Sequence, residues 1–269
     1  MQVRFDFFQC FKESKTPAGL YARKMWLGEA ETPEWKNDFQ VQVEALLQDQ
    51  LPSGSWDHSP IITIQRLFAL HLTVRERTEQ NTKALEWLIN FGCKNIEKRR
   101  GVMPGRVTSK SLQGIPFSPG SVEHLITGAT LFLASIFGYD NDHRVTEVYE
   151  KLCDEGLKKG DRWCGWSCSN NILRALVVHP RYSLSKATAI IVQALGRAQN
   201  SSGAWPKCVP FFQTVNALAH LDVRAVDPQL KLSFERLLKT QHRDGTWGRT
   251  QKEWNTFLIV HALKNKGLL

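Results

Sequence analysis

Histidine and cysteine side chains are the first candidates for chemistry in this chain. Imidazole and thiolate groups are common Zn²⁺ ligands, and three of them with a water molecule would form a catalytic zinc site. The candidates are His58, His124, Cys164, Cys168 and Cys208. Cys164 and Cys168 are four residues apart, which is not the CxxC spacing of a zinc finger, and buried cysteine without a ligand is common. Zinc and unliganded side chains are therefore both open interpretations, and no other cofactor is indicated.

Two acidic residues directly precede histidines. Glu123 stands before His124, and Asp57 stands before His58. A carboxyl group in an apolar cavity has a raised pKa and can act as a general acid. Glu123 in the first turn of a helix, or Asp57 as a helix cap, would equally be stabilised by free backbone N–H groups. Glu123, His124 and Asp57 are the candidate catalytic residues, with helix-end roles as the alternative.

Aromatic residues supply a third set of candidates. A cavity lined by aromatic rings can hold a polyprenyl chain and stabilise a carbocation through the ring faces. Asn170 and Arg174 join this set, because Arg174 would be costly to bury without a partner and would either form a salt bridge between helices or point at a ligand. The candidate ligand-binding residues are Trp166, Asn170, Arg174, Phe211, Phe212, Trp254 and Phe257. Packing in a protein core explains the aromatic members of this set equally well.

Helices must position these residues, because apolar residues recur with helical spacing and no long stretch alternates with a period of two. Outer helices with a polar face are expected at 38–49, 80–93, 143–158, 184–199 and 228–241. Inner, more apolar helices are expected at 60–74, 121–138, 168–179, 209–221 and 253–265, with a further helix near 17–28. Residues 98–120 are rich in Gly, Pro, Ser and basic residues, which predicts an inserted loop that could serve as a lid.

A seven-residue pattern, Gln-x-x-(Asp/Ser)-Gly-x-Trp, occurs three times. The copies are Gln50–Trp56, Gln199–Trp205 and Gln241–Trp247, and we treat them as an internal repeat. Each copy follows an amphipathic stretch and precedes an apolar one, so it marks the turn of a helix pair. Glycine suits the unusual backbone conformation of a helix exit, and the Gln amide can satisfy free helix-end groups. The septads therefore indicate structure rather than catalysis.

The septads resemble the QW motifs of the squalene cyclase and protein prenyltransferase β-subunit superfamily. The resemblance covers about 38 to 265, and three of the five expected turns carry a clean copy. It implies an all-α fold, an α/α toroid of about five outer/inner helix pairs plus an N-terminal helix, in a single domain over 1–269. It also implies that the amino ends of the inner helices surround the mouth of a central cavity. The candidate histidines, cysteines and aromatic residues would meet there.

The sequence also departs from the enzymes of this superfamily. Class II terpene cyclases use an Asp-x-Asp-Asp cluster at the start of an inner helix, and the nearest string here, Tyr139–Asp142, follows one instead. Prenyltransferases bind zinc through an Asp-x-Cys pair, where this chain has Trp166 in place of the Asp, and they require a separate α-subunit. The resemblance thus predicts an enzyme that acts on an isoprenoid or other hydrophobic small molecule without the usual acid. The alternative is a non-catalytic toroid that binds a hydrophobic ligand or a partner protein.

Charge and composition narrow the partners. The formal net charge of +9 favours anionic partners such as diphosphates or membrane head groups, or else reflects a solvated basic surface. Short basic runs without interleaved aromatic residues do not indicate nucleic-acid binding. Scattered cysteines and the lack of a signal-peptide pattern predict a reducing cytoplasm. Peripheral membrane contact through Phe5, Phe7, Phe8 and Phe11 competes with a docked N-terminal arm. The oligomeric state is not predicted.

Overall fold

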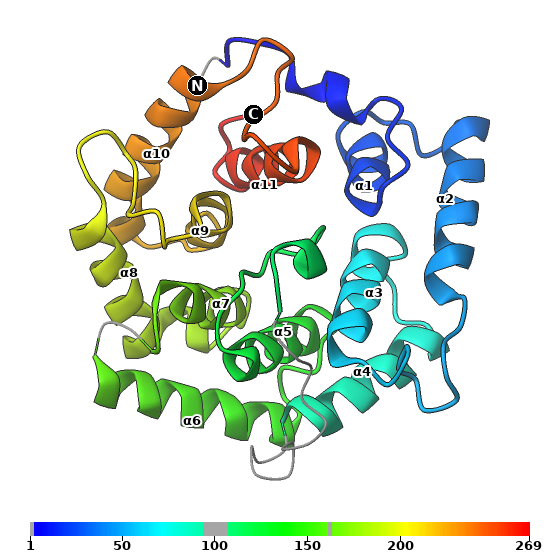
Figure 1. Ribbon diagram of the computed structural model, residues 1–269, viewed down its shortest axis with the longest axis horizontal. Coiled ribbons are helices and arrows are strands. Elements are labelled where there is room, and N and C mark those ends of the chain that lie inside the picture. Colours follow the sequence, from blue (N-terminus) through cyan, green and yellow to red (C-terminus); the bar gives the residue numbers. More distant parts are fainter. Residues whose placement is uncertain (1–2, 94–106, 161–162) are drawn as a thin grey trace.

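The chain folds as an α/α toroid (Figure 1) in a computed structural model that describes residues 3–93, 107–160 and 163–269. Eleven α-helices and no β-strand occur within these ranges. The outer ring consists of α2 (Pro33–Leu47), α4 (Glu79–Gly92), α6 (His143–Lys159), α8 (Lys186–Ala198) and α10 (Asp227–Thr240). The inner ring consists of α1 (Pro17–Met25), α3 (Pro60–Thr73), α5 (Val122–Ile136), α7 (Trp166–Leu176), α9 (Phe211–Leu218) and α11 (Lys252–Asn265). This confirms the predicted fold class.

The predicted helix near 17–28 has a definite place in this ring. It is α1, and Figure 1 shows it between α11 and α3, both of which it contacts. The first inner position is therefore occupied by the N-terminal helix, which closes the ring against the last one. Most helices begin and end close to their predicted limits. The largest difference is α2, which starts at Pro33 rather than 38, because Thr32 accepts a hydrogen bond from the Trp35 amide and Pro33 suits a first helical turn.

The first two septads each join an outer helix to the next inner helix and to the neighbouring outer helix. Gln50 Nε2 donates to the carbonyl of Gly54 in its own turn (2.9 Å) and to that of Gln80 at the start of α4 (2.9 Å). In the same way, Gln199 Nε2 donates to the carbonyls of Gly203 (3.2 Å) and Gln229 (3.1 Å). The indole N–H groups hydrogen-bond to carbonyls near the end of the preceding outer helix: Trp56 to Gln48, Trp205 to Leu195 and Trp247 to Leu237. The structural role predicted for the septads is thus observed.

The third septad holds the N-terminal arm instead of an outer helix. Gln241 accepts hydrogen bonds from the Arg4 and Phe5 amides (both 3.1 Å) and donates to the Phe5 carbonyl (2.9 Å). The arm continues into the 3-10 helix η1 (Phe7–Phe11), whose end residues Phe7 and Phe11 are 4% and 0% exposed. Docking therefore buries two of the four phenylalanines considered for membrane contact, and Phe5 and Phe8 are half-buried. None of the described helices is long and apolar enough to cross a bilayer.

Replacing Gln241 by Ala is expected to release the arm and to lower the free energy of unfolding by about 2 kcal/mol, because several partly buried hydrogen bonds are lost together. Chemical denaturation measures the loss, and limited proteolysis should cut near the N-terminus. Gln40→Ala is the matched control, since Gln40 only donates to Glu44 on the exposed face of α2. An arm as resistant to protease in Gln241→Ala as in the control would contradict this account.

Candidate functional site

The inner ring encloses a cavity of about 100 Å³, which we call the central cavity. Residues of all six inner helices line it. One wall is aromatic: Trp254 stacks on Phe257 with ring centroids 5.3 Å apart, Tyr21 meets Phe257 edge-on at 5.4 Å, and Phe68 meets Trp254 edge-on at 5.9 Å. Such a wall offers both apolar surface and polarisable ring faces to a ligand.

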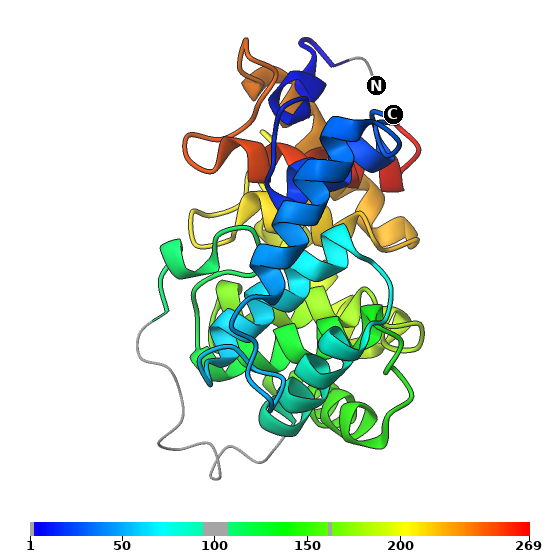
Figure 2. The same cartoon turned by 90° about the vertical axis from the view of Figure 1, so that its right-hand side faces the viewer.

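Residues 107–120, which we call the covering segment, lie beside the starts of α1, α7, α9 and α11. Its 3-10 helix η3 (Lys110–Leu112) lies inside the ring in Figure 1 and at one edge of it in the side view of Figure 2. Ile115 and Phe117 are each 2% exposed, and Pro116 lines the central cavity. Asn171 on α7 anchors the segment through paired 2.9 Å hydrogen bonds with the backbone of Ser118. The rest of the predicted insert, 98–106, lies outside the described residues.

Two pockets flank the covering segment. The larger, about 610 Å³, lies beside the starts of α1 and α11 and along α3, and we call it the mouth pocket. The smaller, about 340 Å³, lies at the starts of α7 and α9 and includes the exposed Cys208. Trp254 lines both the mouth pocket and the central cavity. The two spaces therefore meet at one aromatic side chain, that of Trp254.

Three of the seven predicted ligand-binding residues line the central cavity: Arg174, Trp254 and Phe257. The other four do not. Asn170 Nδ2 donates to Thr214 Oγ1 (2.9 Å) and ties α7 to α9. Phe211 packs against Trp205 of the second septad with centroids 5.6 Å apart, and Phe212 meets Phe211 edge-on. Trp166 is half-buried at the start of α7. The starts of α7 and α9 therefore serve turn packing and the covering segment, whereas Trp254 at the start of α11 lines the central cavity.

The sequence interpretation missed three histidines that line the central cavity. They are His71 near the end of α3, His220 just after α9 and His261 in α11. The repeat carries a signal for them: His71 follows Trp56 by 15 residues, His220 follows Trp205 by 15, and His261 follows Trp247 by 14. Each septad is thus followed, at a nearly constant distance in sequence, by a histidine that lines the central cavity.

The electrostatics of the central cavity are set by burial and by cations. Burial first, and the charge of nearby arginines second, lower the pKa of His71 and of His261 to about 4. The pKa of His220 is lowered well below its ordinary value, first by burial and then by Arg174. Burial alone lowers the pKa of Arg174 to about 9. At neutral pH, neutral imidazoles therefore surround a charged guanidinium.

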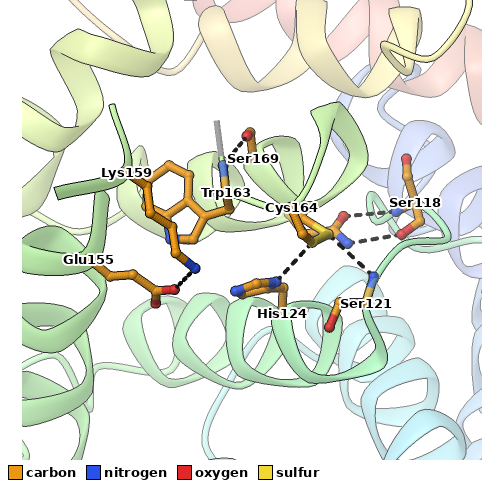
Figure 3. Close-up of a disulfide and its surroundings, with 10 residues drawn as sticks. Ser118, Ser121, His124, Glu155, Lys159, Trp163, Cys164 and Ser169 are labelled. Carbon is orange, nitrogen blue, oxygen red and sulfur yellow. Dashed lines mark hydrogen bonds and ion pairs between the residues drawn. A yellow bond between two sulfur atoms is a disulfide. The ribbon is translucent and has the colours of Figure 1, made fainter. Parts of the chain in front are cut away.

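The predicted catalytic residues lie outside both the central cavity and the mouth pocket. Asp57 is exposed in a turn with a left-handed backbone (φ +52°). Glu123 is half-buried in the first turn of α5. Beside it, His124 faces α6 and the start of α7 rather than the ring centre (Figure 3). Burial lowers the pKa of His124, and the charges of Glu155 and Glu123 oppose this effect. The structure therefore brings Glu123 and His124 together but keeps Asp57 apart.

The structure also brings some of the predicted metal ligands together and keeps others apart. His124, Cys164 and Cys168 place their donor atoms within 4.8 Å of one another, and His124 Nδ1 lies 3.3 Å from Cys164 Sγ. His58 is exposed beside Asp57, and Cys208 is at the smaller pocket, so neither joins this trio.

Cys164 and Cys168 are joined by a disulfide (Figure 3). This departs from the expectation of scattered cysteines in a reducing compartment, and the reason is local: the loop into α7 and its first turn bring the two Cα atoms to 6.0 Å, a normal separation for a disulfide. Zinc requires thiolate sulfur. In the disulfide form the trio does not fit a zinc site, and we derive no chemical step through a metal.

Comparison with known proteins identifies the fold. No family model matches the chain, and no curated protein sequence is detectably similar. Among solved structures, the chain is similar to the type II terpene cyclase MstE from Scytonema, with a TM-score of 0.57 and 13% sequence identity over 95% of this chain and 89% of that one.

Two ligand complexes of MstE variants match equally well. One holds geranylgeranyl dihydroxybenzoate as substrate, with a TM-score of 0.59 over 98% of this chain and 88% of that one. The other holds merosterolic acid A as product, with a TM-score of 0.59 over 98% and 87%. Both are 13% identical to this chain. At this identity the similarity establishes a shared terpene-cyclase fold.

Proposed function

We propose that this protein binds an isoprenoid or similarly apolar small molecule inside its ring, as the binding step of a terpene-cyclase-like or prenyltransferase-like enzyme. The observation that carries the proposal is the aromatic wall of the central cavity, which reaches the mouth pocket at Trp254. The mouth pocket, at about 610 Å³, is within the usual range for small-molecule sites, and the central cavity, at about 100 Å³, is below it. A ligand would therefore occupy both. The MstE complexes with prenylated molecules support this use of the fold.

The chemistry that follows binding is constrained by charge. The described residues that line the central cavity include no Asp or Glu, so no carboxylic acid there can protonate an alkene. The mouth pocket, by contrast, does contain an acidic residue, Glu253, and its carboxyl group accepts hydrogen bonds from Ser14 and Thr16. A buried, charged Arg174 would also repel a carbocation formed beside it. Cyclisation started by a cavity carboxylic acid is therefore not the reaction we propose.

The same observation favours a second candidate function. A toroid without an acid in its cavity can hold an apolar ligand without converting it, and such a binding protein would need only the walls already described. Incubation with farnesol or farnesyl diphosphate followed by mass spectrometry of the extracted ligand separates the two candidates. A new product supports the enzyme, and unchanged ligand recovered from the protein supports the binding protein.

Trp254→Leu is expected to weaken the binding of farnesol about tenfold, because the stacked wall between mouth pocket and central cavity is lost. Isothermal titration calorimetry measures the change. Trp87→Leu is the control, since Trp87 stacks on Phe91 within the outer helix α4, away from both spaces. Absence of saturable binding by the unmodified protein, or equal affinities of the two variants, would overturn the proposed site.

A further inference from the structure

Arg174 is a buried cation without an anionic partner. It is 1% exposed on α7, and its Nη1 and Nη2 donate to Asn216 Oδ1 (2.7 Å) and to the Gln213 carbonyl (3.0 Å). Its Nε has no hydrogen-bond partner. No carboxylate of the described residues forms an ion pair with it, although buried charges are normally paired. A guanidinium in this position remains charged at neutral pH.

The other charged and titratable groups at this end of the cavity are basic as well. The charges that act on His71 come from Arg75 and His261, and those that act on His261 come from Arg174 and Arg75. The charges that act on His220 include Arg174 and Lys266. Arg75 is exposed at the end of α3, with its guanidinium 5.1 Å from the centre of the Tyr21 ring. All of these groups can donate hydrogen bonds, and no described acid balances them.

The basic groups and the aromatic wall lie in one small space. The rings of His220 and His261 are 5.4 Å apart, and Asn216 Nδ2 lies 3.5 Å from His261 Nδ1. Phe257 is 6.0 Å from His261, ring to ring, and continues to Trp254 at the mouth pocket. From the basic end of the central cavity to the mouth pocket, the lining therefore changes from hydrogen-bond donors and positive charge to apolar surface.

We propose that the end of the central cavity formed by Arg174, His220 and His261 receives the anionic head group, a carboxylate or a phosphate, of the ligand whose apolar part lies along the aromatic wall. This rests on the proposed function, because it concerns the same ring cavity. The size supports it: about 100 Å³ accommodates a head group, and the tail must extend past Trp254 into the mouth pocket. The anion would pair with Arg174 and replace the missing carboxylate.

A purely structural role for Arg174 does not account for its charge. The two hydrogen bonds that tie α7 to α9 could be made by a neutral amide, whereas the guanidinium adds the cost of burying a charge. The two roles make different predictions. A structural strut changes the stability of the protein but not its choice between charged and neutral ligands.

The test compares three probes with the same tail: farnesol, farnesoic acid and farnesyl monophosphate. The unmodified protein is expected to bind at least one of the anions about 30-fold more tightly than farnesol by calorimetry, as a charge-assisted contact would give. The carboxylate and the phosphate are tested separately, and the anion that binds with the higher affinity identifies the class of head group. Equal affinity for all three would overturn the head-group proposal and leave the proposed function standing. Failure of farnesol and both anions to bind would overturn the proposed function itself.

Two variants assign the preference to Arg174. Arg174→Gln is expected to bring the affinities for the anions within about threefold of the affinity for farnesol. Asn216→Asp keeps Arg174 but gives it an internal carboxylate, and it should abolish the preference as well. Arg224→Gln, which removes an exposed positive charge in the 3-10 helix η5 (Arg224–Val226), is the control and should retain the preference. Retention of the preference in folded Arg174→Gln would refute the assignment, and the wild-type comparison stands even if a variant does not fold.

Discussion

Alanine at Gly203 is expected to lower the free energy of unfolding by about 4 kcal/mol or more, enough to leave little folded protein. Gly203 has a left-handed backbone (φ +75°), which costs an L-residue about 1–2 kcal/mol. A Cβ there would lie 2.1 Å from the carbonyl oxygen of Leu232 on α10. The second septad and α10 would have to separate, which would also break the hydrogen bond from Gln199 to the Gln229 carbonyl. Equilibrium denaturation in urea measures the loss.

The matched control isolates the clash from the backbone strain. Gly28, after the end of α1, has nearly the same conformation (φ +72°), and a Cβ there would meet no atom within 4 Å. Gly28→Ala should therefore cost only the conformational term, about 1–2 kcal/mol. Similar losses of unfolding free energy in Gly28→Ala and Gly203→Ala would show that the close approach of the septad to α10 is not the reason why position 203 requires glycine.

The ring could be predicted from sequence because its repeat has a physical cause. Each septad makes the same contacts to its own turn and to the next element, so three copies mark three equivalent turns. The replacement of a sixth outer helix by the N-terminal arm could not be predicted in the same way. The atoms that Gln241 binds are backbone atoms of Arg4 and Phe5, and backbone partners leave no mark in the sequence.

The site could be predicted only in part, because a helix buried on most sides does not show which side faces the cavity. On α5, nearly every residue from His124 to Ala134 is buried, so apolar periodicity could not separate His124, which faces α6, from Phe132, which lines the central cavity. The family resemblance directed attention to helix starts, and the covering segment lies beside several of them. The histidines deeper in the ring lie at repeated distances from the septads, and comparison of the copies with one another would have found them.

Acidification is expected to destabilise the protein well before its carboxylates titrate, because the cavity histidines are buried in the neutral form. The ordinary pKa of histidine is 6.5, and burial lowers that of His71 and of His261 to about 4. The unfolded chain therefore takes up protons below pH 6.5 that the folded chain does not accept until about pH 4. Their stabilising contribution is complete above pH 6.5 and is lost as the pH falls from 6.5 to 4. At 1.36 kcal/mol for each unit, the loss is about 3 kcal/mol for each of the two histidines.

Urea denaturation at half-unit steps between pH 7 and pH 4 measures this loss, and a variant assigns it. The glutamine in His261→Gln cannot take up a proton. The free energy of unfolding of this variant should therefore fall less steeply with acidity than that of the unmodified protein, and near pH 5 the slope should correspond to about one proton fewer. His143→Gln is the control, because the His143 side chain is 89% exposed at the start of α6 and should leave the slope unchanged. A slope in His261→Gln identical to that of the unmodified protein would mean that the pKa of this imidazole is the same in the folded and the unfolded chain, and it would contradict the predicted effect of burial.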